Sequence, residues 1–338
     1  MKSILSILIV AVFISCNSSS NEDTYAVKKA PEKSELNKQA NTFFASVTQL
    51  EKKDLKEEKV NLGKRLYFDK RLSKNNTISC NSCHNLSTYG VDNLPTSPGD
   101  TKEFGTRNSP SVLYAHLHSS QFWDGRAKDV EEQAGMPILN PVEHSIPDSL
   151  YLVKKLKKID NYVKSFNEVY PESGLTFENL TNAIGAFERK MTPVSQFDRY
   201  LDGDEDALTA KQKDGLKAFI NNACITCHSG VALGGSMMQK FGLFGNYWEY
   251  TKSKKIDKGL AEVTGKSSDE YIFKVPSLRN ITKTGPYFHD GSVESLEKSI
   301  KIMAKLQSNK DITEDEVADI ISFLESLEAD LDPEMKTL

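Results

Sequence analysis

Several features that identify common protein classes are scarce in this chain of 338 residues. Its net charge is only −4, so no excess of basic residues indicates a nucleic-acid partner. The apolar run at residues 4–14 is too short to span a bilayer as a permanent helix. Strand-like alternation of apolar and polar residues is also scarce, which predicts a mainly α fold. With 38% hydrophobic and 27% charged residues, the composition is that of an ordinary globular protein long enough for two domains.

Cysteine is scarce too, and four of the five cysteines lie in two copies of one motif. Residues 80–84 read CNSCH and residues 224–228 read CITCH. In this pattern two thiols form thioether bonds to a haem and the histidine ligates its iron. A zinc site or a redox dithiol is the alternative for one such pair, but no further pair completes a four-ligand zinc cage. The motifs therefore predict two c-type haems. The attachment residues are Cys80, Cys83, His84, Cys224, Cys227 and His228.

The N-terminal residues have the pattern of an export signal, with Lys2, the apolar run and then Ser15 and Cys16. Residues 13–16 resemble a lipoprotein processing box, which predicts a signal peptide at 1–16 and a lipid on Cys16, although Phe13 departs from the usual Leu. A plain cleaved signal is the alternative. The mostly polar residues 17–44 are typical of a flexible tether. We therefore expect a periplasmic protein attached to a membrane only through this lipid, in the compartment where c-type haem is attached.

The rest of the chain contains an internal repeat. Pro110-Ser111 and Pro276-Ser277 each precede a Phe-x-Asp-Gly sequence at equal spacing, and each block follows its own haem motif. Together with a break near residue 192, this predicts two cytochrome c-like domains, each with one covalently bound haem. The N-terminal haem domain is expected at 45–192 and the C-terminal haem domain at 193–330.

The group opposite each histidine decides whether a haem iron transfers electrons or binds substrate. In the second half, Met303 lies on a predicted helix, and as a ligand it would give the raised reduction potential of a His/Met iron. Packing in the core is its alternative role. Met237 and Met238 are competing candidates for the ligand. In the first half, Pro137 is expected to break the corresponding helix, and Glu143 follows. A carboxylate over an open haem face can transfer the proton that O–O cleavage requires, whereas an exposed loop Glu is the alternative.

These residues lie in longer stretches that resemble bacterial di-haem cytochrome c peroxidase, of the MauG-related superfamily. The resemblance covers about residues 45–328 and includes DNLPTS, RNSPSVL, QFWDGRA, EEQA, NPVE, LKAFINNACITCHSGVALGG and VPSLRNITKTGPYFHDGS. It implies two cytochrome c domains that face each other, a peroxidatic N-terminal haem, a high-potential C-terminal haem and calcium between them.

The resemblance also implies roles for single residues. Glu143 matches the family's acid–base carboxylate, and Gln133 matches its neighbour in the peroxide pocket. Trp123 matches the tryptophan between the haems, as an electron relay, a core aromatic at the interface, or both. Met303 matches the distal ligand of the C-terminal haem. The implied calcium ligands, all hard oxygens, come from Asn108, Thr284 and Pro286.

One position departs from the family pattern. Where relatives commonly have a loop histidine that caps the resting peroxidatic iron, this chain has Asp100, a poor ligand for haem iron. We therefore expect that this iron rests open or water-bound and that the enzyme needs no reductive activation. His144 stands where relatives often have Met, and it is an alternative distal ligand or a residue that tunes the pKa of Glu143.

The expected reaction is reduction of hydrogen peroxide to water with electrons from a small cytochrome c or a cupredoxin. Two alternatives remain open: a MauG-like oxidase of a partner protein, in which a Tyr replaces the residue at Met303, and a non-catalytic di-haem electron carrier. The family often forms homodimers, although no sequence feature of this chain demonstrates one.

Overall fold

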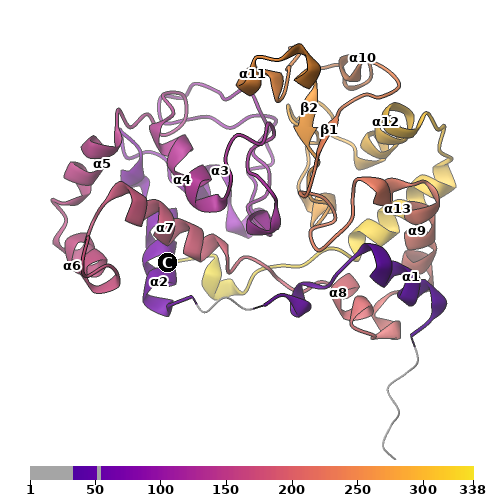
Figure 1. Ribbon diagram of the computed structural model, residues 1–338, viewed down its shortest axis with the longest axis horizontal. Helices are drawn as coiled ribbons and strands as arrows, with labels where there is room; N and C mark the ends of the chain where they lie inside the picture. The colour runs from indigo at the N-terminus through magenta and orange to yellow at the C-terminus, as the bar shows by residue number, and fades with distance from the viewer. Residues whose placement is uncertain (1–32, 52–54) are drawn as a thin grey trace, which may run out of the picture. The chain divides into compact units, whose positions relative to one another are not determined.

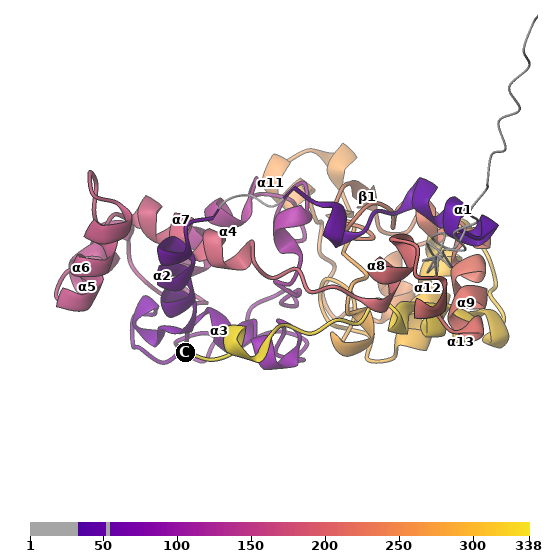
Figure 2. The same cartoon turned by 90° about the horizontal axis from the view of Figure 1, so that it is seen from below.

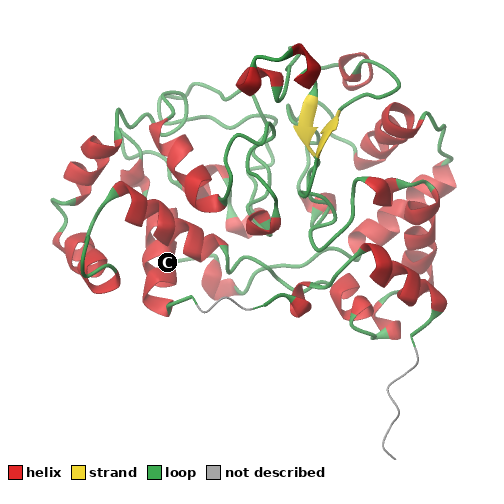
Figure 3. Cartoon of the chain, in the orientation of Figure 1, coloured by secondary structure: helices red, strands yellow, loops and turns green. Residues whose placement is uncertain are grey.

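The computed structural model describes residues 33–51 and 55–338, and residues Lys33–Leu338 form one compact unit. The predicted signal peptide, Cys16 and the first part of the predicted tether lie outside the described residues. The described chain is mainly helical, as predicted (Figures 1 and 3). Its helices are α1 (Glu35–Phe43), α2 (Glu57–Phe68), α3 (Cys80–Cys83), α4 (Val130–Leu139), α5 (Ser149–Leu156), α6 (Asp160–Val169), α7 (Phe177–Glu188), α8 (Gln196–Leu201), α9 (Ala210–Asn221), α10 (Tyr247–Thr251), α11 (Ala261–Thr264), α12 (Leu296–Ser308) and α13 (Glu314–Glu325).

Strands β1 (Met238–Lys240) and β2 (Ile272–Lys274) form a short antiparallel pair, with Gln239 opposite Phe273. Across the ranges that the structure covers, we find no helix with the length and apolar character needed to cross a bilayer.

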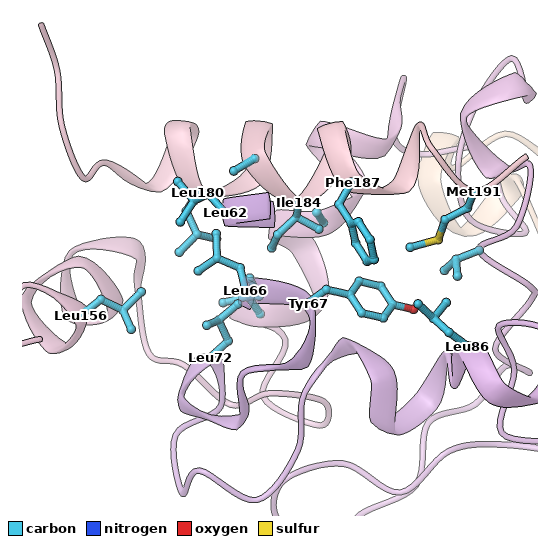
Figure 4. Packing of buried hydrophobic residues seen from close by; sticks show 14 of the residues in the cluster. Leu62, Leu66, Tyr67, Leu72, Leu86, Leu156, Leu180, Ile184, Phe187 and Met191 are labelled. Carbon is cyan, nitrogen blue, oxygen red and sulfur yellow. The ribbon is translucent and has the colours of Figure 1, made fainter. Parts of the chain in front are cut away.

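The first hydrophobic core is built on the contact between α2 and α7. Leu62, Leu66 and Tyr67 of α2 are fully buried against Ile184 and Phe187 of α7 (Figure 4). The helices approach closely because a glycine faces the partner backbone: a Cβ at Gly63 would lie 1.8 Å from the carbonyl oxygen of Ala183. Helix α2 thereby presents Tyr67 toward the first haem motif.

The second core repeats this arrangement with α9 and α13. A Cβ at Gly215 of α9 would lie 1.9 Å from the carbonyl oxygen of Asp319 on α13. Phe219 and Phe323 pack between the helices with their ring centroids 5.2 Å apart. In each half, therefore, the helix that precedes the haem motif is held by a glycine contact with a later helix.

The repeat predicted from the sequence also appears in the backbone. The isolated bridges Gln121–Ala127 and Tyr287–Val293 stand at matching places in the two blocks. Phe122 and Phe288 share the unusual left-handed backbone conformation, with φ of 66° and 71°. Each block thus folds into the same local structure, which places Trp123 and His289 at equivalent positions.

The two ends of the described chain pack on opposite cores. Helix α1, which falls within the predicted tether, begins at the N-cap Ser34 and contributes Ala40 to the second core beside Phe44. That part of the tether prediction is wrong because apolar α1 side chains and Phe44 find a buried partner in Phe197, 5.3 Å from the Phe44 ring. At the other end, Leu331 is buried in the first core, and the chain ends close to α2 (Figures 1 and 2).

A buried ion pair between Asp198 and Arg279 connects segments from both halves of the chain. The guanidinium of Arg279 donates two hydrogen bonds of 2.8 Å to the carboxylate of Asp198, and both side chains are fully buried. Asp198 also accepts a bond from the backbone N–H of Val47, and Arg279 lies 4.8 Å from the ring centroid of Tyr114. The pair therefore connects α8, the repeat blocks and the segment after α1.

Candidate functional site

The first haem motif forms α3, a single helical turn. Ser79 begins it with a capping box completed by Ser82, and His84 follows its last residue. The hydroxyl of Tyr67 donates to the carbonyl oxygen of His84 at 2.6 Å. The Nδ1 atom of His84 lies 3.0 Å from the carbonyl oxygen of Pro110. This anchors the ring through one nitrogen and leaves Nε2 for a metal, which is the usual arrangement of a ligating histidine.

The second motif has the same arrangement. A short 3₁₀ turn covers Cys224–Thr226, and Nδ1 of His228 lies 3.2 Å from the carbonyl oxygen of Leu233. Burial lowers the pKa of His228 to about 4, so the ring is neutral near pH 7 and Nε2 can act as a ligand. Gly234 packs against this ring, since a Cβ there would lie 3.3 Å from Nδ1.

A largely apolar cavity of about 510 Å³ adjoins the second motif. Cys224, Cys227 and His228 line it, and so does Met303 from α12. Two thiols, a neutral imidazole and an apolar cavity fit a covalently attached haem. The role of Met303 as the second ligand of this haem stays a prediction. Among its competitors, the sulfur of Met238 lies against Gly125 and Met237 is 36% exposed.

Glu143 lies in the turn after α4 and is half-buried. Burial raises its pKa, while Arg126 and a hydrogen bond of 2.7 Å from the Asn140 amide oppose that rise. Its charge in turn acts on the Cys83 thiol, so the carboxylate stands beside the first motif. Gln133 lies on α4, and its proximity to Glu143 stays a prediction.

The expected helix break at Pro137 is wrong in detail. Pro137 lies inside the last turn of α4, which continues to Leu139. The helix ends directly afterwards, and the carbonyl oxygen of Pro137 accepts bonds from the N–H groups of Asn140 and His144. These bonds fold the chain back and bring Glu143 and His144 to the end of α4.

Asp100 is turned toward the backbone before the first motif. Its buried carboxylate accepts hydrogen bonds from the N–H groups of Asn75 and Thr77, at 2.8 and 3.3 Å, and from the Thr77 hydroxyl. Burial alone would raise its pKa, but these bonds hold the pKa below its ordinary value. The N–H of Asp100 donates to the carbonyl oxygen of Glu143 at 2.8 Å. Asp100 therefore holds the loop against the Glu143 turn.

His144 is buried beside the same site. Its Nδ1 lies 3.1 Å from the carbonyl oxygen of Leu72, and burial lowers its pKa to about 4. Its ring interacts electrostatically with His84. A buried, neutral imidazole anchored at Nδ1 has the form of a ligand, so the structure keeps His144 as a candidate for the distal position.

Trp123 connects the two halves. Its indole N–H donates to the carbonyl oxygen of Asn108 at 2.9 Å, and its own carbonyl oxygen accepts from the N–H of Lys274 on β2 at 2.7 Å. Its ring meets that of His289 edge to face, with the centroids 6.4 Å apart. Trp123 also lines the cavity beside the second motif, and its place between two haems stays a prediction.

The three predicted calcium residues lie along the same cavity: Asn108, Thr284 and Pro286. The Asn108 amide nitrogen donates to the carbonyl oxygen of Leu94 at 2.9 Å, which leaves the amide oxygen for another partner. In the part of the chain that the structure describes, no group of three His, Cys, Asp or Glu side chains could hold a metal. The residues present offer neutral oxygens, which suit Ca²⁺ when water completes its shell.

The sequence patterns described above gave no role to Lys274 or His118. Both side chains line the cavity beside the second motif, and Lys274 is only 6% exposed. Neither residue belongs to a motif, and they come together from segments 156 positions apart. Their association depends on the tertiary fold, so no local pattern could have revealed it.

Comparisons with known proteins agree with this geometry. Residues 57–206 match the family model of di-haem cytochrome c peroxidase, and residues 212–328 match that of cytochrome c. Each matched region contains one haem motif. Cytochrome c551 peroxidase of Pseudomonas aeruginosa is 44% identical over 300 residues, which cover 86% of this chain and 86% of that protein.

Proteins of the MauG type are also similar. The methylamine utilization protein MauG of Methylophilus methylotrophus is 30% identical over 285 residues, which cover 80% of this chain and 82% of that protein. Among solved structures, a MauG-like protein associated with microbial copper homeostasis matches with a TM-score of 0.72 and 27% identity, over 93% of this chain and 97% of that chain.

Proposed function

The chain belongs to the di-haem cytochrome c peroxidase family, with two cytochrome c-type domains and two c-type haems, and from this premise we propose how its halves divide the reaction. Hydrogen peroxide binds at the N-terminal haem and is reduced to water. Electrons enter at the C-terminal haem from a small cytochrome c or a cupredoxin. The balance is two electrons and two protons for each peroxide, which yields two waters.

The observation that carries this proposal is the difference between the two motifs' surroundings. Glu143, a half-buried carboxylate with a raised pKa, stands beside the first motif. Met303 shares a cavity with His228 of the second. A proton-transfer group suits a centre where O–O cleavage occurs, whereas a thioether suits one that stores an electron.

The protein residues then have defined tasks. The haem held by Cys80, Cys83 and His84 supplies an iron that can bind peroxide and accept electrons one at a time. The Glu143 carboxylate takes the proton of the near peroxide oxygen and returns it to the far, departing oxygen. Asn140 holds that carboxylate through its 2.7 Å hydrogen bond. Because burial raises the pKa of Glu143, this carboxylate is a stronger base than an exposed one, which favours its acceptance of the proton.

Trp123 is the proposed relay between the centres. Its indole bonds to Asn108, and its ring lies edge to face with His289 in the second half. The proposed calcium site at Asn108, Thr284 and Pro286 would stiffen the same contact, because Asn108 binds Trp123 through its carbonyl oxygen and His289 through its N–H.

The proposed location is the periplasm, with a lipid on Cys16 as the link to the membrane. The export-like N-terminus supports both points, and attachment of c-type haem requires export. A homodimer remains a further proposal that sedimentation of the haem-loaded protein would test.

The proposed resting state has no protein ligand from the loop, because Asp100 is already bonded to Asn75 and Thr77. His144 is the remaining alternative for the distal position. An EPR spectrum of the oxidised protein separates the two: a high-spin first haem supports the open state, and a bis-His low-spin signal that His144→Ala abolishes supports ligation by His144.

One measurement tests the function as a whole: peroxide consumption by the haem-loaded protein with a reduced small cytochrome as donor. The peroxidase proposal predicts sustained turnover with two donors oxidised per peroxide. A non-catalytic carrier would exchange electrons without consuming peroxide. A MauG-like oxidase would use peroxide to oxidise a protein side chain; Met303 argues against it because that class has Tyr at this position.

A further inference from the structure

Lys274 on β2 is a buried cation without a carboxylate partner. Its Nζ donates to the carbonyl oxygen of Ser120 at 3.0 Å and lies 3.2 Å from Nδ1 of His118, and both partners are neutral acceptors. Asp124 is the carboxylate that acts on Lys274 electrostatically, but that group is already paired with Arg107 and Arg126. Burial consequently lowers the pKa of Lys274 to about 8.

His118 is held in place beside Lys274, and one of its ring nitrogens makes no hydrogen bond to the described residues. Its ring packs against Gly235, where a Cβ would lie 2.2 Å from Cδ2 of the imidazole. The next residue, Ser119, donates its N–H to the Gly235 carbonyl oxygen at 2.9 Å. With Nδ1 accepting from Lys274, Nε2 carries the proton, and this buried atom has no hydrogen-bond partner among the described residues.

Both side chains line the cavity of the second motif, which contains no anion to meet them. The described residues that line this cavity include no Asp or Glu. They include one other cation, Arg279, and its charge is compensated by Asp198. A buried cation and an unpaired N–H donor at one cavity together form an incomplete anion site, since buried charges and donors are normally paired.

We infer that Lys274 and His118 bind a carboxylate of the second haem and thereby raise the reduction potential of that haem. A haem carries two propionate carboxylates, and His228, Cys224 and Cys227 place this group in the same cavity. Lys274 compensates the charge of one carboxylate, and Nε2–H of His118 donates to it. A cation near the haem favours the state with one more electron. The inference depends on haem binding at the second motif and not on peroxide turnover.

The test compares reduction potentials of the second haem in purified haem-loaded protein, by spectroelectrochemical titration. Lys274→Met is expected to lower the potential by at least the equivalent of a tenfold change in the equilibrium constant, about 59 mV for a one-electron couple. His118→Asn should lower it by less, because it replaces a neutral donor by a shorter side chain whose amide does not reach the position of Nε2. The matched control is Lys298→Met on α12, which removes the same charge from an exposed position and should have little effect because solvent and salt screen it.

A second readout addresses the carboxylate itself. The propionate bending band in the resonance Raman spectrum should shift in Lys274→Met and in His118→Asn, and stay in place in Lys298→Met. Equal potentials for Lys274→Met and Lys298→Met would overturn the inference, as would an unchanged propionate band. If Lys274→Met does not retain haem, the inference is tested with Lys274→Arg and His118→Asn instead. Lys274→Arg must keep the potential near that of the parent and His118→Asn must lower it.

Discussion

The two halves of this protein share one frame and differ on the face where each haem would meet a second ligand. Each half has a glycine-mediated helix contact, a histidine anchored at Nδ1 and a repeat block with the same backbone conformation. After the block, α12 runs for 13 residues and presents Met303, whereas α4 ends after ten residues and is followed by Glu143. Because the two halves share the rest of this structure, the proposed difference in function follows from the segment after each repeat block. That segment carries Met303 in the second half and Glu143 in the first.

The equivalent positions of the two blocks also meet each other. Trp123 and His289 occupy the same place in their blocks, and their rings are in contact. Asn108 bridges them, since it accepts from the Trp123 indole and donates to the His289 carbonyl oxygen. Matching positions that carry Trp in one block and His in the other therefore form one of the contacts between the halves.

The largest expected effect comes from removing the group unique to the first half. Glu143→Gln should reduce peroxide turnover by about 10² to 10⁴-fold, because the amide cannot transfer the proton. Steady-state assays with a reduced cytochrome measure this. The control is Glu103→Gln, the same change at an exposed position of the neighbouring loop. A Glu143→Gln rate equal to that of the parent would contradict the assignment.

The buried Asp198–Arg279 pair belongs to the second half and contacts Val47 and Tyr114 of the first, so its loss should have the largest effect on stability. Asp198→Asn leaves Arg279 buried without its partner and should destabilise the fold by about 3–5 kcal/mol in guanidinium unfolding at pH 7. Although burial would raise the pKa of Asp198, the bonds from Arg279 hold it below the ordinary 3.8. The carboxylate's contribution is therefore present above pH 3.8 and is lost as pH falls through the lowered pKa.

The exposed pair Asp214–Lys217 provides the control for that experiment. Asp214→Asn should leave the unfolding midpoint unchanged, because solvent screens a surface pair. The difference in stability between the parent and Asp198→Asn should shrink below pH 3.8. A difference that persists there would show that packing, and not the ion pair, carries the effect.

Removing the thioether of Met303 takes away the group that distinguishes the second half from the first. Met303→Leu should lower the reduction potential of the second haem by more than about 59 mV, which corresponds to a tenfold change in the equilibrium constant. The reason is that a thioether ligand raises the potential. Spectroelectrochemistry measures the shift. Met238→Leu is the matched control, because that sulfur lies against Gly125. A shift confined to Met238→Leu would reassign the ligand.

The smallest effect concerns pH. Glu143 must be ionised to accept the peroxide proton, and burial raises its pKa above the ordinary 4.5. The rate should therefore decline as pH falls, with the midpoint of the decline above pH 4.5. In Glu143→Gln the residual rate should lack that decline. The same midpoint in both proteins would assign the titration to another group.

Local patterns in the sequence sufficed for much of this structure. The haem motifs and the repeat depend on residues close together in the chain, and both appear in the structure at the predicted positions. Met303 lies on a helix, as predicted, and lines the cavity beside the second motif, while its role as a haem ligand stays a prediction.

The parts that were missed depend on long-range packing. Pro137 stays inside α4 because it interrupts only the last turn. Residues 35–43 look polar, yet they form a helix because Ala40 and the following Phe44 reach a core supplied by residues more than 150 positions later. The meeting of His118 with Lys274 likewise has no local signature.

The crossed ends of the chain have a consequence for how the protein matures. A polypeptide emerges from the ribosome N-terminus first, and domains usually fold in that order. Here Leu331 packs in the first core, whose other buried residues lie between positions 47 and 191, while α1 packs on a core built from residues 197–327. Because each core includes residues from the other half of the chain, neither core is complete until both halves have been synthesised, and we expect the two cores to finish folding together.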